Sequence, residues 1–127
     1  FALANAGLED SGRYNEFQRL VDIQAFCNLM LVQIYGGTAD WDAASNWYAG
    51  RRIRPTGKYQ FFIWDSERSL EAVDANILNA DDDRSPTRLF QALRRNACFM
   101  RSVLNGQAAL FTRSDEHPAE GSSHGLV

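Results

Sequence analysis

Acidic and amide side chains gather in two short segments of this chain. Asp40, Asp42 and Asn46 lie in the first segment, and Asp65 and Glu67 lie in the second. Hard cations such as Mg²⁺ take oxygen ligands, commonly one or two carboxylates together with the phosphate oxygens of a substrate. The residue types therefore indicate a magnesium and phosphate site. Two other interpretations stay open: the residues cap loops and end a strand, or two of the carboxylates act as a pair that hydrolyses glycans.

The elements that must position these residues begin with two helices between Arg13 and Tyr35. Apolar residues in this region follow a helical period, and Asp22 is a typical N-cap that divides it into two helices. The second helix is apolar almost all round, which predicts that it is buried. It is expected to end at Gly36-Gly37, where the backbone can turn sharply.

A β-hairpin is predicted to follow the first acidic segment. Residues 46–49 form a short candidate strand, and residues 59–64 form a second strand rich in aromatic residues, most of which we expect in the core. Between the strands lie the turn Pro55-Thr56-Gly57 and a basic group, for which a solvated hairpin end is favoured over a phosphate site. The acidic segments stand at the ends of this hairpin.

The remainder of the chain is predicted to be a loop, two helices and a tail. Residues 68–84 show no clear pattern, Ser85-Pro86 is a typical helix start, and Asn96 is expected to cap a last helix that ends at Gly106. We predict a domain over residues 1–106 and a disordered tail over residues 107–127. The two cysteines, Cys27 and Cys98, are expected to be buried free thiols.

Composition excludes several classes of protein. The 127 residues form one domain of α+β class, with buried helices and an antiparallel hairpin. No apolar run approaches the roughly 18 residues of a membrane-spanning helix. The net charge of −3 and the isoelectric point near 5.3 argue against a dedicated nucleic-acid binder. Lys58 is the only lysine, and it lies at the predicted hairpin turn.

Several motifs follow one another in a fixed order along roughly residues 14 to 104. They include Tyr35-Gly36-Gly37-Thr38, Asp40-Trp41, Asn46-Trp47-Tyr48-Ala49, Gly57-Lys58-Tyr59, Trp64-Asp65-Ser66-Glu67, Ser85-Pro86 and Leu89-Phe90-Gln91-Ala92-Leu93. In this order the motifs resemble the CotH kinase-like family, which includes the spore-coat protein CotH. The resemblance implies a divergent protein-kinase-like fold that transfers phosphate from ATP to Ser or Thr hydroxyls of a protein substrate. It also implies a spore coat, the cell surface or secretion as the location.

The resemblance assigns roles to the acidic and amide residues. It implies that Asp40 is the catalytic carboxylate, that Asn46 and Asp65 hold Mg²⁺ against ATP, and that Glu67 assists. Asp42 stands where the family more often has proline, and the spacing from Asp40 to Asn46 is one residue longer than usual. Asp42 is therefore an alternative to Asp40 as the working carboxylate.

The glycine-rich loop and the lysine of a kinase N-terminal lobe have no counterpart before Asp40. The resemblance thus covers only the C-terminal catalytic lobe, and it implies that this chain is an incomplete fragment that does not turn over ATP efficiently by itself. A non-catalytic surface or binding module of the same family is the main alternative.

Overall fold

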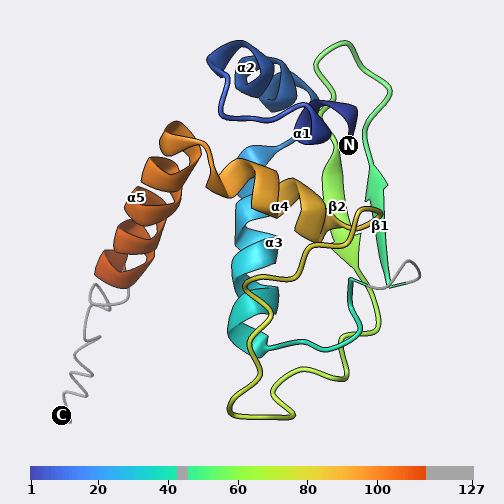
Figure 1. Ribbon diagram of the computed structural model, residues 1–127, viewed down its shortest axis with the longest axis vertical. Helices are drawn as coiled ribbons and strands as arrows, with labels where there is room; N and C mark the ends of the chain where they lie inside the picture. The colour runs from blue at the N-terminus through green and yellow to red at the C-terminus, as the bar shows by residue number, and fades with distance from the viewer. Residues whose placement is uncertain (43–45, 114–127) are drawn as a thin grey trace, which may run out of the picture.

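The computed structural model describes residues 1–42 and 46–113, and it combines helices with a two-stranded antiparallel hairpin (Figure 1). The elements are α1 (Ala2–Asn5), α2 (Ser11–Leu20), α3 (Ile23–Gly36), β1 (Trp47–Gly50), β2 (Gln60–Ile63), α4 (Pro86–Arg94) and α5 (Ala97–Arg113). The coarse expectation of an α+β domain is confirmed.

Helices α2 and α3 are separated at Asp22, as predicted. The Asp22 carboxylate accepts a hydrogen bond of 3.1 Å from the amide of Ala25, which satisfies one of the free donors of the first turn. The main chain of Asp22 also donates to the carbonyl of Tyr59 at 3.0 Å, so the start of α3 is fixed to the start of β2. Helix α3 ends at Gly37, which adopts the left-handed conformation with φ 53°.

The hairpin packs one of its faces on α3. Trp47 pairs with Ile63 and Gly50 pairs with Gln60 in the register of the two strands. Phe61 points to α3, where its ring meets the ring of Phe26 edge-on with centroids 5.1 Å apart. Because side chains alternate across a strand, Phe62 faces the other way.

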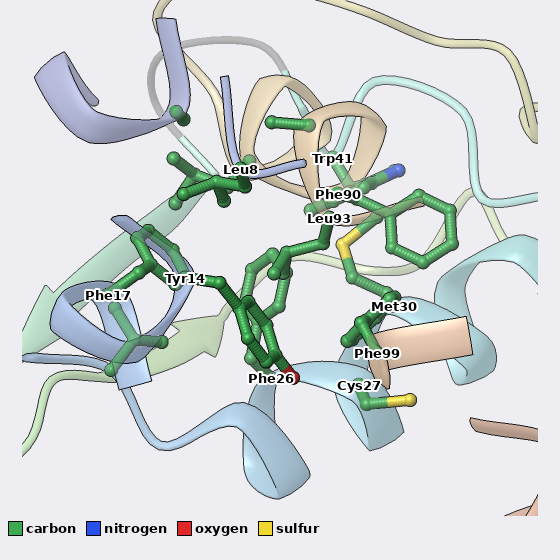
Figure 2. Close-up of a cluster of buried hydrophobic side chains, with 14 residues drawn as sticks. Leu8, Tyr14, Phe17, Phe26, Cys27, Met30, Trp41, Phe90, Leu93 and Phe99 are labelled. Atoms are coloured by element: carbon green, nitrogen blue, oxygen red, sulfur yellow. The ribbon is translucent and has the colours of Figure 1, made fainter. Parts of the chain in front are cut away.

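The core lies between α2, α3, α4 and the beginning of α5, and α1 and the segment after it also contribute to it, with Leu8 completely buried (Figure 2). Leu93 of α4 and Phe99 of α5 are completely buried, and the ring of Phe90 meets Phe99 edge-on at 6.3 Å. Trp41 joins this core although it lies in the loop after α3, and only 1% of its surface is exposed. The acidic segment around Trp41 is thereby anchored to the domain.

The last two helices begin as the sequence predicts, but the final helix ends later. Ser85 Oγ accepts from the amide of Thr87 at the start of α4, and Asn96 Oδ1 accepts from the amide of Phe99 in the first turn of α5. Helix α5 continues to Arg113 instead of ending at Gly106. Residues 114–127 lie outside the described part, so the disordered tail stays a prediction there.

Three expectations about burial are wrong. Helix α3 is not buried all round, because Val32 and Tyr35 are exposed on the side away from the core. Most aromatic side chains of the 59–64 strand are also exposed, namely Tyr59, Phe62 and Trp64. Phe62 and Trp64 alternate to the uncovered face of the hairpin, and Tyr59 lies before the start of β2. Cys27 is buried but Cys98 is exposed, because Cys98 lies on the outer face of α5. Among the described helices, none is long and apolar enough to cross a bilayer.

Candidate functional site

The two acidic segments come together at one end of the hairpin, beside the C-terminus of α3 (Figure 1). Main-chain bonds join them at three levels: Trp64 donates to Asn46, Ala39 donates to Arg68, and Leu70 donates to Gly36, at 3.2, 3.1 and 2.7 Å. These bonds hold the loop after α3 against the loop after β2. The predicted site residues therefore belong to one local structure.

The side chains of Thr38 and Ser69 add a link between these loops that the sequence did not indicate. Their hydroxyl oxygens lie 2.8 Å apart, and Ser69 also donates to the carbonyl of Ser66 at 2.8 Å. Thr38 is almost fully buried. A partly buried hydrogen bond between residues 31 positions apart helps to hold both loops in one conformation.

Asp40 and Asn46 are connected directly. The Asn46 side-chain amide donates a hydrogen bond of 2.9 Å to the main-chain carbonyl of Asp40. Asp40 has φ 69°, a left-handed conformation that is uncommon for residues other than glycine. Its side chain is exposed to solvent next to the buried Trp41. The loop thus presents a carboxylate outward from an anchored backbone.

Asp42 differs from Asp40 in its environment. Asp42 is half-buried, and this burial raises the pKa of its carboxyl group, with the negative charges of Asp82 and Asp40 adding to the effect. A carboxylate with a raised pKa is the better proton acceptor. This difference favours Asp42 for accepting a proton, while Asp40 is the more accessible ligand.

Asp65 and Glu67 are neighbouring carboxyl groups in the loop directly after β2. Asp65 has φ 55°, which reverses the chain directly after β2 and lets Glu67 approach it. The hydrogen bond to Asp65 raises the pKa of Glu67, and the charge of Asp65 acts in the same direction. Two adjacent carboxylates share a proton or attract a cation, because their charges repel each other at neutral pH.

Arg68 is a further component of this site that the sequence reasoning did not single out. Its guanidinium binds Glu71 at 3.1 Å, and this contact raises the pKa of Arg68, with Asp40 and Glu67 contributing by their charge. Arg68 is thus the cation of this acidic site. The only sequence signal was its place directly after Glu67.

The donor set fits a magnesium ion only in part. Across residues 1–42 and 46–113, no three His, Cys, Asp or Glu side chains lie close enough together to hold a metal ion by themselves. The pair Asp65 and Glu67 supplies two carboxylates, which is the number that Mg²⁺ commonly takes from a protein when substrate phosphates complete its shell. Asn46 and Asp40 are further residues with oxygen atoms, and they lie in the loop after α3, which is hydrogen-bonded to the loop after β2.

Lys58 lies far from these residues along the hairpin. It is exposed at the turn end, whereas the acidic residues lie at the open end of the strands. The expectation that Lys58 is a solvated turn residue is confirmed. Since it is the only lysine in the sequence, no lysine of this chain can serve the acidic site.

Comparison with known proteins adds no relative. No protein-family model, no curated protein and no solved structure matches this chain.

Proposed function

We propose that residues 40–42, 46 and 65–68 form the magnesium and phosphate site of a CotH-type atypical protein kinase. The proposed reaction is phosphate transfer from ATP to Ser or Thr hydroxyls of a protein substrate. The observation that supports it best is the close association of the two loops, which places Asp40, Asn46, Asp65 and Glu67 at one end of the hairpin.

Each residue has a role that follows from its environment. Asp65 and Glu67 are the ligands for Mg²⁺, because their mutual repulsion is relieved by a cation. Asn46 fixes the Asp40 backbone and lies beside the metal ligands. When bound, Mg²⁺ neutralises phosphate charge. Asp40 orients the attacking hydroxyl, and Asp42 is the alternative proton acceptor in view of its raised pKa.

Paramagnetic NMR tests this placement. With Mn²⁺ substituted for Mg²⁺ in the presence of ATP, we expect line broadening centred on residues 40–42, 46 and 65–68. The matched comparison is the acidic run Glu9-Asp10 ahead of α2, where Arg95 already pairs with Glu9 at 3.7 Å. Broadening centred on that run instead would contradict the proposal.

A non-catalytic binding module is the second candidate. Tyr48 and Phe62 stack with ring centroids 5.0 Å apart on the uncovered face of the hairpin, and Trp64 lies exposed beyond them. Exposed aromatic groups of this kind are common at protein interfaces. A module of this kind would bind a partner through this face without any need for Mg²⁺ or ATP.

The carboxylate-pair hydrolase receives less support. Glycoside hydrolysis needs two carboxyl groups on opposite sides of a sugar, separated by roughly 5 Å or more. Asp65 and Glu67 instead stand two positions apart in one loop, and Asp65 raises the pKa of Glu67. Two neighbours in one short loop are not an arrangement on opposite sides of a sugar.

A further inference from the structure

The turn end of the hairpin, opposite the acidic site, carries a concentrated positive charge around a hollow. This hollow has a volume of about 660 Å³, and its lining includes the basic side chains Arg51, Arg52, Arg54 and Lys58. The chain as a whole has a net charge of −3, so this turn is a positively charged region of an acidic protein. We propose that this hollow, here called the basic pocket, binds a compact ligand with two or more phosphate groups.

The three arginines are not neutralised by the protein. In the described part of the chain, every ion pair within 4.0 Å involves other cations, namely Arg68, Arg88 and Arg95. Arg51 lies over the ring of Tyr59 with 5.1 Å between the guanidinium carbon and the ring centroid. This contact orients the guanidinium group but leaves its positive charge unneutralised and its N–H groups available for hydrogen bonds.

The single carboxylate in the lining does not cancel these charges. Asp22 already accepts hydrogen bonds from the Ala25 amide and from the side chain of Gln60 at 3.1 Å. These bonds lower the pKa of Asp22, and the charge of Lys58 acts in the same direction. The lining therefore holds four cations against one carboxylate, which leaves an excess of three positive charges.

The backbone of the turn holds the arginines close together. Arg54 donates to the carbonyl of Arg52 at 2.8 Å, and Gly57 donates to the carbonyl of Arg54 at 2.9 Å. A Cβ atom on Gly57 would collide with the Arg52 carbonyl oxygen, so this tight turn requires glycine. The turn is thus built to present several guanidinium groups around one small volume.

The size and composition of the basic pocket favour phosphate groups on a compact ligand. Guanidinium groups match phosphate oxygens with paired hydrogen bonds, and several of them in one hollow match several linked phosphates. An extended nucleic acid would need a longer basic surface than a single hairpin turn. Free pyrophosphate and a phosphorylated lipid headgroup share the required chemistry.

Calorimetry with sodium pyrophosphate in EDTA tests the proposal without involving the magnesium site. We expect binding that weakens as salt is raised, and a loss of affinity of about tenfold or more in the double variant Arg52→Ala/Arg54→Ala. The matched control Arg84→Ala/Arg101→Ala removes the same charge from exposed positions outside the pocket lining, and it should retain the affinity within about twofold. Thermal unfolding of each variant verifies that it is folded.

Vesicles distinguish the two sources of phosphate. Binding to phosphatidylinositol bisphosphate vesicles but not to phosphatidylcholine vesicles, with the same loss in Arg52→Ala/Arg54→Ala, would identify a lipid headgroup as the ligand.

The proposal is overturned if neither pyrophosphate nor these vesicles bind, or if a polyglutamate peptide binds more tightly than both. It is equally overturned if Asp65→Asn abolishes pyrophosphate binding while the double arginine variant retains it. Failure of the kinase proposal would leave this result unchanged, because the two sites lie at opposite ends of the hairpin.

Discussion

The side-chain amide of Asn46 donates a hydrogen bond of 2.9 Å to the main-chain carbonyl of Asp40. This bond closes the acidic loop between α3 and β1. The carbonyl of Asn46 in turn accepts from the amide of Trp64, just before Asp65. One residue therefore connects both halves of the proposed site.

Replacing Asn46 with Ala should open this loop. Loss of the hydrogen bond to Asp40 is expected to lower the free energy of unfolding by about 1 kcal/mol, and to weaken Mg²⁺-dependent nucleotide binding. Urea denaturation and a binding titration measure the two effects. An unchanged denaturation midpoint together with unchanged binding would show that the Asn46 side chain does not organise the loop.

Glu67→Gln tests the repulsion between the two carboxylates. The hydrogen bond to Asp65 raises the pKa of Glu67, so its stabilising contribution is present at pH values below the ordinary Glu pKa and is lost as the pH rises through the raised folded value. At neutral pH and low salt, the variant should therefore melt at a higher temperature than the natural chain. In acid, below the ordinary Glu pKa, this gain should disappear.

The control for this variant is Glu71→Gln, which removes the same charge from the partner of Arg68 at 3.1 Å. Loss of an attractive pair should not raise the melting temperature. Mg²⁺ should stabilise the natural chain more than Glu67→Gln. Equal stabilisation of both would argue against Glu67 as a metal ligand.

Gly37→Ala should disturb the end of α3 and the loop that crosses it. Gly37 has φ 53°, and a Cβ atom there would lie 2.7 Å from the Cβ of Ala75. We expect a loss of about 1–2 kcal/mol in unfolding free energy, from left-handed strain alone. Gly50→Ala is the matched control, because a Cβ atom on Gly50 would meet no atom within 4 Å. Similar losses in the two variants would refute this explanation.

Trp41→Ala should detach the acidic loop from the core. Trp41 is 1% exposed, and removing a buried aromatic side chain of this size costs about 3–5 kcal/mol. Trp64→Ala provides the comparison, since Trp64 is 62% exposed and lies beside the same site. Chemical denaturation should show a much larger loss of unfolding free energy in Trp41→Ala than in Trp64→Ala. A larger loss in Trp64→Ala would contradict the proposed anchoring role of Trp41.

Local signals in the sequence explain which parts of the fold could be predicted. The caps at Asp22, Ser85 and Asn96 depend on residues two or three positions away, and all three form as predicted. Burial was harder to predict because it depends on which faces find partners. The alternation of β2 turns Phe61 towards α3 and leaves Phe62 outside, a result that a run of aromatic residues cannot indicate.

In the candidate site, too, the sequence indicated the local features but not those that depend on contacts between distant segments. The positions of Asp40, Asn46, Asp65 and Glu67 along the chain indicated two acidic segments, and the contacts between the loops bring these segments together. The pairing of Glu67 with Asp65 requires the left-handed backbone at Asp65, and the participation of Arg68 requires the crossing of the two loops. Neither feature has a short-range sequence pattern.

The most direct test of the central proposal is a calorimetric titration of this chain with ATP in the presence of Mg²⁺. We expect a Mg²⁺-dependent binding component that is lost in EDTA, lost in Asp65→Asn, and retained in Asp74→Asn, which removes the same charge from the exposed loop after β2. Binding of ATP phosphates at the basic pocket needs no Mg²⁺, so each titration is repeated with Arg52→Ala/Arg54→Ala added to remove that component. Absence of Mg²⁺-dependent binding in the natural chain, or full binding by Asp65→Asn, would contradict the central proposal.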